Sequence, residues 1–323
     1  SVAAGGTDVS VTTALTSGQG TTITSRGNAR LASVTATTGD MVVNALTGEV
    51  TGVGAGAANL EATAGKVTVN GGALARLGTV KSGSDLSVTA DAINVASANV
   101  SGAMSLIADV GNALLDTGIV TGTSLLQAPG NVTVGNLQSG GTATLSAGGT
   151  ASATTIGQTT SAGAAINVTG GTLDLTEIDS KAGLALEATA GDLKIGRATA
   201  AGNLSLTTSG TGANAGDIQA DNLTTTFASG GTTTINSSRD VRLGLAVSSG
   251  AMKIDSVGST RATNLQTTVA GSGITVTAGS ANLTGVDSAG ALALTANNGA
   301  LIVDIAKAAT TAELKTIAPG GTD

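Results

Sequence analysis

The chain lacks several residue types on which common enzyme sites depend. Its 323 residues include no histidine, cysteine, tryptophan or tyrosine, and they include one phenylalanine, Phe227. Without histidine and cysteine, the usual serine and cysteine triads, zinc sites and thiol chemistry are excluded. The absence of cysteine fits an extracellular protein that does without disulfides, and it is equally compatible with the cytosol.

Charge and long apolar runs are scarce as well. Charged residues make up 11% of the chain, the 14 basic residues are scattered, and the net charge is −7. Because basic clusters are missing, we expect no nucleic-acid partner. The longest apolar stretches, such as residues 300–303, have the length of a strand and not of a membrane helix, so we expect no membrane insertion. The chain opens with SVAAGG, which predicts a mature product or an excerpt of a longer protein.

Glycine, in contrast, is abundant and periodic. The chain has 49 glycines, and a series of them recurs about every 20 residues: Gly83, Gly102, Gly122, Gly140, Gly163, Gly183 and Gly202. A Leu-x-Leu-like pair follows most of them: Leu86 and Val88, Met104 and Leu106, Ile166 and Val168, Leu184 and Leu186, Leu204 and Leu206. A fixed period of this size predicts a solenoid, in which no repeat buries its apolar face alone.

Each repeat carries two further apolar segments. A second glycine-led pair occurs at Val67 and Val69, Val132 and Val134, Leu173 and Leu175, Leu193 and Ile195, Met252 and Ile254, Leu301 and Val303. A shorter third segment holds one apolar residue, at Ile119, Leu137, Ile156, Ile178 and Ile218. Alternation of period two indicates strands with one buried face. Frequent glycine and abundant threonine and valine oppose long helices.

These segments predict an all-β fold, a single-stranded right-handed parallel β-helix with three short strands in each turn of about 20 residues. Glycine is expected at the corners because it adopts positive φ without penalty. Alanine is expected as the third inward residue, at Ala108, Ala188 and Ala296. We expect residues 1–323 to form one continuous β-helix, an excerpt of a longer fibre, with looser loops near 47–58, 207–216 and 256–264.

The two ends of the chain share a short motif. Residues 3–8 read AAGGTD and residues 318–323 read APGGTD. The match has two explanations: chance in a biased composition, or one period of a longer tandem array. A tandem array would also explain the lack of a polar cap, which an open solenoid end requires.

Carboxylates are the remaining candidates for chemistry. Asp174, Glu177, Asp179 and Glu187 are close in sequence, and Asp217 and Asp221 form a second acidic pair. A general acid–base pair or a calcium cluster would use such residues. Solvated strand faces and turns explain them better, since Asp40, Asp192 and Asp217 each directly follow a glycine as turn residues do, so we expect no catalytic, cofactor-binding or metal-binding residues. The calcium repeat GGxGxD is absent, and Gly210 with Gly212 lacks the rest of a phosphate loop.

A regular threonine lattice would indicate an ice-binding face. The outward residues of the second pair predict one column: Thr68, Thr133, Asp174, Lys194, Lys253 and Thr275. Aspartate and lysine interrupt this column, so we expect no ice-binding lattice there.

The repeats, with GxLxLxA followed by xxGxLxI, resemble the roughly 19-residue repeats of the filamentous haemagglutinin family of Gram-negative exoproteins. The resemblance spans nearly the whole chain and is clearest at 83–206. It implies an adhesin of the two-partner secretion pathway, or the stalk of a contact-dependent inhibition toxin, threaded unfolded through an outer-membrane pore and folded outside. The family's secretion domain with its NPNG- and NPNL-type motifs is missing, since the chain has no Asn-Pro.

The sequence therefore predicts a structural and adhesive shaft of a secreted or surface-anchored fibre, on the outer face of a Gram-negative cell, with no catalysis and no cofactor. Its expected partners are further copies or turns along the fibre axis and an unidentified ligand on a host or neighbouring cell. One alternative is a subunit of a self-assembling extracellular filament that stacks end to end. A second is a polysaccharide-degrading β-helix enzyme, which would need long loops and a cleft with clustered carboxylates, basic residues and aromatic platforms.

Overall fold

The structure is a computed structural model that describes residues 2–3, 7–160, 165–226 and 230–317. The chain divides into two compact units, Ser1–Thr160 and Ser161–Asp323. Both are parallel β-solenoids, with about 15 turns of roughly 20 residues along the chain. This confirms the predicted fold class. The union of the two units into one β-helix stays a prediction, and residues 4–6 and 318–323 of the shared terminal motif lie outside the described residues.

The first unit consists of two sheets, a short-strand sheet and a long-strand sheet. The short strands are β1 (Val2–Ala3), β3 (Thr21–Ser25), β5 (Met41–Ala45), β8 (Val67–Gly71), β10 (Leu86–Ala90), β12 (Met104–Ala108), β14 (Ser124–Ala128) and β16 (Ala143–Ala147). The long strands are β2 (Val9–Ser17), β4 (Ala29–Ala36), β9 (Leu74–Ser82), β11 (Ala92–Val100), β13 (Ala113–Val120), β15 (Val132–Ser139) and β17 (Thr150–Gln158). The level between β4 and β9 is split into β6 (Val50–Thr51) and β7 (Ala58–Ala62) by the 3-10 turn η1 (Val53–Ala55).

The second unit repeats this plan. Its short strands are β18 (Ile166–Gly170), β20 (Leu184–Ala188), β22 (Leu204–Thr208), β24 (Thr233–Ser237), β26 (Met252–Ser256), β28 (Ile274–Ala278), β30 (Leu292–Ala296) and β32 (Ala312–Thr316). Its long strands are β19 (Thr172–Ser180), β21 (Leu193–Ala200), β23 (Ile218–Thr225), β25 (Val241–Ser248), β27 (Ser259–Thr267), β29 (Ser280–Ser288) and β31 (Leu301–Ala308). The 3-10 turn η2 (Gly212–Asn214) lies between β22 and β23.

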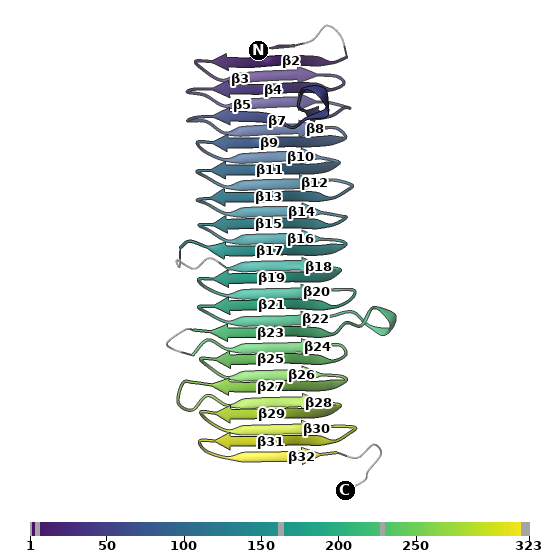
Figure 1. The fold of residues 1–323 in the computed structure, drawn as a ribbon, viewed down its shortest axis with the longest axis vertical. Helices are drawn as coiled ribbons and strands as arrows, with labels where there is room; N and C mark the ends of the chain where they lie inside the picture. The colour runs from purple at the N-terminus through teal and green to yellow at the C-terminus, as the bar shows by residue number, and fades with distance from the viewer. Residues whose placement is uncertain (1, 4–6, 161–164, 227–229, 318–323) are drawn as a thin grey trace. The chain divides into compact units, whose positions relative to one another are not determined.

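Each solenoid turn is one short strand followed by one long strand. In each unit, the long strands at the front of Figure 1 run from right to left and the fainter short strands behind run back, while the chain descends. This is a right-handed coil, as predicted. Within each unit, the described strands pair in parallel with the equivalent strand of the next turn, as Asp174 pairs with Lys194. That pair confirms the register expected from their 20-residue separation.

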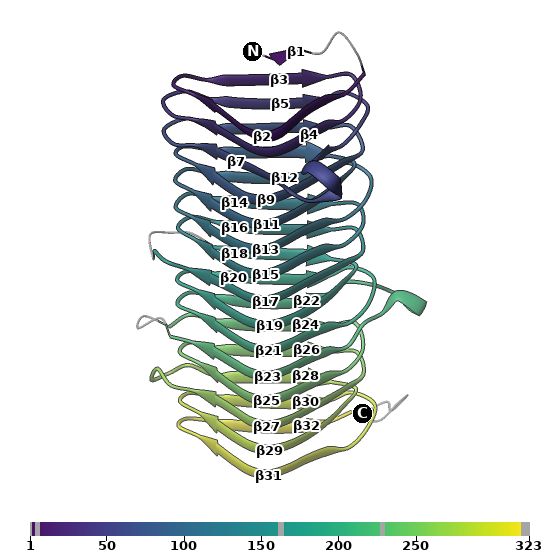
Figure 2. The ribbon, with the colours of Figure 1, turned by 45° about the horizontal axis from the view of Figure 1, so that its top comes forward.

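The long strand contains both the second and the third segment expected from the sequence. Its outward and inward residues alternate until Thr176 and Glu177, two consecutive residues that both face solvent. The pairing between β19 and β21 omits one position there, between the Leu175–Ile195 and Glu177–Arg197 pairs. The strand bends at this point, and Figure 2 shows the same bend in the long strands of each unit. Three faces per turn are thus made by two hydrogen-bonded strands.

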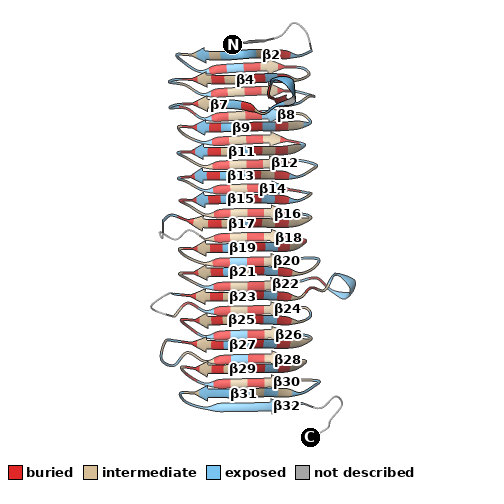
Figure 3. Cartoon of the chain, in the orientation of Figure 1, coloured by how far each residue is buried: buried red, intermediate tan, exposed pale blue. Residues whose placement is uncertain are grey.

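The inward positions form a narrow aliphatic core in each unit. The six residues predicted to share the core of the second unit are all buried: Leu184, Leu186, Leu193, Ile195, Leu204 and Leu206. The expected third inward residues Ala108, Ala188 and Ala296 are buried too. Figure 3 shows these buried positions as stripes that recur at the same place in successive strands.

Two residues assigned to the inward position of the third segment do not occupy it. Ile119 is 52% exposed, because the neighbouring Gly118 takes the inward position beside Leu137. Ile218 is buried, but it begins β23 and pairs with Leu193, which belongs to the second segment. Ile119 was therefore assigned to the right segment but to the wrong face, and Ile218 was assigned to the wrong segment.

The loops also differ in part from expectation. The ranges 47–58 and 207–216 contain the 3-10 turns η1 and η2, in which Gly54 and Gly212 have positive φ. The range 256–264 is not a loop, since β27 begins at Ser259. Hydroxyl residues there replace aliphatic ones at inward positions: Thr260 is buried and its Oγ1 lies 2.8 Å from Ser256 Oγ. The connecting segment lies instead at 268–273, between β27 and β28.

The corner glycines are required for close stacking more than for positive φ. Among the described glycines, positive φ occurs at Gly54, Gly212, Gly230 and Gly271, outside the periodic series. A Cβ on Gly122 would instead lie 2.7 Å from the Gly102 carbonyl oxygen of the turn before it. Backbones of successive turns therefore approach too closely at this corner for a side chain.

We expect Gly135→Ala to destabilise the first unit by about 1–3 kcal/mol, because the new Cβ would overlap the Asp116 carbonyl oxygen in the preceding turn. Gly157→Ala, in the next long strand, is the matched control, since no atom of the described residues other than its two chain neighbours lies within 4 Å of a Cβ at that position. The control should be neutral or stabilising by up to about 1 kcal/mol. Chemical denaturation of both variants measures the difference, and equal losses of stability would contradict the close-approach explanation.

We expect Leu204→Asp to disrupt the turns around β22 at a cost of at least about 3 kcal/mol, because it places an unpaired charge in the core. Ser205→Asp, one residue later on the outward face, should change stability by less than about 0.5 kcal/mol. Resistance to proteolysis reports both. Comparable sensitivity of the two variants would show that the inward and outward assignment is wrong.

Candidate functional site

The four acidic residues considered as a cluster are distributed over different faces of the second unit. Asp174 lies opposite Lys194 in the long-strand sheet. Glu177, beyond the bend, lies 3.4 Å from Nη1 of Arg197 in the next turn. Both positions face solvent, where an ion pair contributes well under about 1 kcal/mol.

The other two acidic residues are also engaged with neighbours. Asp179 forms an ion pair of 2.5 Å with Lys181 at the end of β19. Glu187 lies in the short-strand sheet, and its Oε1 accepts a hydrogen bond of 2.9 Å from Ser209 Oγ. Among the described residues, no group of three or more acidic side chains is placed to hold a metal ion. The structure therefore does not gather these residues into one site.

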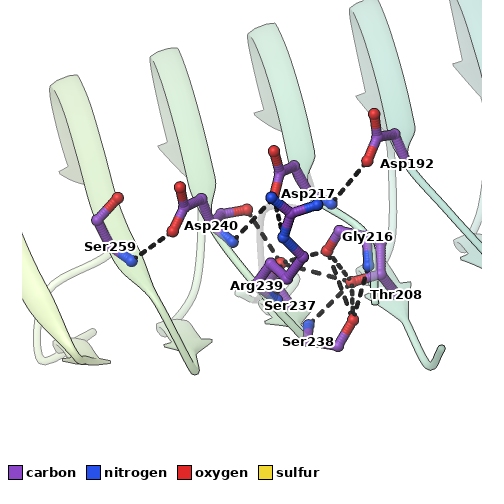
Figure 4. A network of polar contacts seen from close by, with 9 residues as sticks. All are labelled: Asp192, Thr208, Gly216, Asp217, Ser237, Ser238, Arg239, Asp240 and Ser259. Atoms are coloured by element: carbon purple, nitrogen blue, oxygen red, sulfur yellow. Dashed lines mark hydrogen bonds and ion pairs between the residues drawn. The ribbon is translucent and has the colours of Figure 1, made fainter. Parts of the chain in front are cut away.

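Asp217 belongs to a ladder at the corner that precedes the long strands, seen in Figure 4. Its backbone N–H donates to Asp192 Oδ1 at 3.0 Å, and its own Oδ1 accepts from the Asp240 N–H at 3.2 Å. Asp240 Oδ1 in turn accepts from the Ser259 N–H at 2.7 Å. Arg239 adds an ion pair of 3.5 Å to Asp217. Each carboxylate thus satisfies a backbone donor of the next turn.

The first unit has an equivalent ladder built from aspartate and asparagine. Asp8 Oδ1 accepts from the Asn28 N–H at 2.9 Å, and Asn28 Oδ1 accepts from the Glu49 N–H at 3.0 Å. Hydrogen bonds from the Asn28 backbone and side chain, with Arg30 beside them, hold the pKa of Asp8 below its usual value. Asn112 and Asn131 continue the pattern. These side chains link turns and are not arranged around a substrate.

Hydroxyl groups form a hydrogen-bond network at the corner where the loop with η2 returns to the sheet, as Figure 4 also shows. Thr208 Oγ1 donates to the Gly216 carbonyl oxygen at 2.9 Å and accepts from the Ser238 N–H at 2.9 Å. Ser238 Oγ accepts from the Gly216 N–H at 3.0 Å, and Ser237 Oγ lies 3.1 Å from the Gly216 oxygen. Gly210 and Gly212 lie in the loop that this network anchors, so they serve the turn geometry.

The predicted outward threonine column combines residues from two sheets. Thr68, Lys253 and Thr275 lie in short strands, whereas Thr133, Asp174 and Lys194 lie in long strands. The assignment failed because both strands of a turn follow a glycine and carry the same apolar pair. The six residues therefore do not form one column and cannot test for a lattice.

The structure also places together two arginines that the sequence analysis treated as scattered. Arg242 in β25 and Arg261 in β27 occupy paired outward positions beside a depression of about 380 Å³ in the long-strand sheet of the second unit. Their separation of 19 residues, the length of one turn, was the available signal. The pair was missed because basic residues were compared by their distance along the sequence and not by their equivalent positions in successive turns.

We expect Thr21→Val to stabilise the first unit by about 1 kcal/mol, because Thr21 Oγ1 is buried and has no hydrogen-bond partner among the described residues. Thr208→Val is the matched control: it removes a buried hydroxyl that makes hydrogen bonds, and it should cost about 1–3 kcal/mol. Denaturation midpoints of the two variants should therefore move in opposite directions. A shift in the same direction would show that Thr21 is satisfied, or that the corner network contributes nothing.

Comparison of the chain with protein-family models, curated proteins and solved structures found no match. Among the described residues, no helix has the length and apolar character required to cross a membrane.

Proposed function

We propose that the chain is a structural and adhesive shaft segment of a secreted or surface-attached bacterial fibre, without catalysis. The observation that carries the proposal is the last described turn of the second unit, β31 and β32. Leu314 occupies the same inward position as Leu294 in the turn before it, but it is 53% exposed and Leu294 is fully buried. Figure 3 shows β32 as an exposed strand.

The inward positions of this turn carry the same kind of apolar residues as those of interior turns, although no described turn covers its outer side. Ala306 is also exposed there, although its partner Val286 in the turn before is buried, and the backbone groups on the far side of β31 and β32 have no neighbouring strand among the described residues. A free edge of this kind pairs readily with another strand. A solenoid turn stacked on this edge would bury the apolar row and continue both ladders, which is the contact that a shaft role requires.

A second candidate, a subunit of an end-to-end filament, is favoured by the same edge, because another copy could stack on it. The enzyme alternative has less support. The candidate carboxylates lie on separate faces, and the polar side chains of the corner are engaged in turn-to-turn hydrogen bonds. The resemblance to filamentous haemagglutinin repeats supports the secreted, adhesive setting.

The purified chain should associate end to end as its concentration rises, because burial of the exposed apolar row stabilises contact between turns. Light scattering and electron microscopy measure the length of the assemblies. Leu314→Asp should shorten them at least severalfold, since it charges the uncovered turn.

Val257→Asp is the matched control, because Val257 is 73% exposed but lies at a lateral corner between β26 and β27. It should leave the assemblies unchanged. A chain that stays monomeric up to millimolar concentration would argue against the proposal. Equal inhibition by the two variants would point to lateral apolar contact in place of stacking.

A further inference from the structure

The depression beside Arg242 and Arg261 is a lateral feature, separate from the uncovered turn. It lies on the outward face of four consecutive long strands, β23, β25, β27 and β29. Gln219, Asp221 and Asn282 line it with the two arginines. All five side chains face solvent.

The two arginines break the charge pattern of the ladders. Other charged residues in directly paired positions of the described strands are of opposite sign: Asp174 with Lys194, Glu177 with Arg197, Glu61 with Lys81, Asp287 with Lys307. Arg242 is paired with Arg261 instead. Strands of a sheet are about 4.8 Å apart, and like charges placed opposite one another are destabilising.

No carboxylate of the described residues lies within 4.0 Å of a guanidinium nitrogen of this pair. Neither arginine takes part in an ion pair, although seven such pairs occur elsewhere in the described chain. The positions before and after them in the ladder are the neutral amides Gln219 and Asn282. Two arginines that form no ion pair with a described residue therefore occupy neighbouring positions in the ladder, between two amides.

Gly244, at the bend of β25, lines the depression without a side chain. A Cβ there would overlap the Asp221 carbonyl oxygen, so the close approach of β23 and β25 at the bend requires glycine. Thr263 and Thr284 occupy the bend in the next two turns and add hydroxyl groups to the same wall. A ligand can thus reach the guanidinium groups from the side of the bend.

We propose that this depression binds a carboxylated sugar of a surface polysaccharide. A carboxylate matches the planar donor fork of arginine and would neutralise the like-charge pair. The amides of Gln219 and Asn282, the threonine hydroxyls and the Asp221 carboxylate offer donors and acceptors for sugar hydroxyls. The volume of about 380 Å³ is in the range of small-ligand sites.

Two features favour an acidic sugar over a nucleic acid. Single-stranded nucleic acids stack their bases on aromatic side chains, and the lining of the depression contains none. Asp221 lies in the wall and the chain carries a net charge of −7, which disfavours a densely charged polyanion. A sugar polymer with isolated carboxylates and many hydroxyls fits both features.

This inference deepens the proposed adhesive function, because it names the chemistry of the ligand. It concerns a lateral face, whereas the shaft role depends on the uncovered turn. Loss of the sugar site would leave end-to-end association unchanged, so the two ideas fail in different experiments.

The test is titration of the full chain with trigalacturonate, with neutral galactotriose as the second probe, by calorimetry or by NMR of the arginine side chains. The wild type should bind trigalacturonate and should bind galactotriose at least about tenfold more weakly. Arg242→Gln and Arg261→Gln should each weaken trigalacturonate binding about tenfold or more. Both variants should be at least as resistant to thermal unfolding as the wild type, because each removes a like-charge contact.

Arg197→Gln is the matched control, since Arg197 lies in the same sheet, outside the depression, in an ion pair with Glu177. It changes the net charge equally and should leave the affinity unchanged. Absence of trigalacturonate binding at millimolar concentration would overturn the proposal. So would equal affinity for the neutral sugar, or equal weakening by all three substitutions, which would indicate general electrostatic attraction.

Discussion

Stacking of one turn on the next, in parallel and in register, is the interaction on which the rest of each unit depends. A single turn has one short and one long strand, and the two lie in different sheets. Its backbone hydrogen bonds go to the turns before and after it, and its inward residues are covered by the same neighbours. Because the apolar rows are narrow, each turn is stable only as part of a series.

Register is enforced at the corners as well as in the strands. The ladder through Asp192, Asp217 and Asp240 accepts one backbone N–H per turn, and it continues past the loop that carries η2. Gly122 allows close approach of backbones that a Cβ would prevent. A one-residue slip would reverse the inward and outward faces and break the corner contacts together. Such redundancy explains how a core built from alanine, valine and leucine can specify one arrangement.

The periodic part of the sequence was sufficient to predict the fold. The alternation at Leu184, Leu186, Leu193 and Ile195 has one interpretation in a solenoid, and the pairing of Asp174 with Lys194 follows from counting residues. The predictions were wrong where a residue that is not aliphatic fills an inward position of the repeat. Thr260 fills an inward position as a hydroxyl, and Gly118 fills another as a glycine. A search for apolar residues alone does not detect either position.

The lateral depression could not be predicted in the same way. Its residues come from four turns, and what distinguishes them is their shared place beside the bend of the long strand. The merging of two segments into one bent strand was not expected, so the column of Gln219, Arg242, Arg261 and Asn282 had no defined position. Whether a charged residue faces a residue of opposite charge depends on its partner in the next turn. That partner can be identified only when the length of every loop between the two strands is known.

Native-state hydrogen exchange, followed by mass spectrometry, tests the stacking account most directly. If stability comes from neighbouring turns, amide protection should be highest in the central strands of the second unit, such as β22 to β26. It should fall steadily toward β31 and β32, which have a neighbour on one side only among the described residues. Equal protection in β32 and β24, or rapid exchange throughout the short strands, would contradict the account.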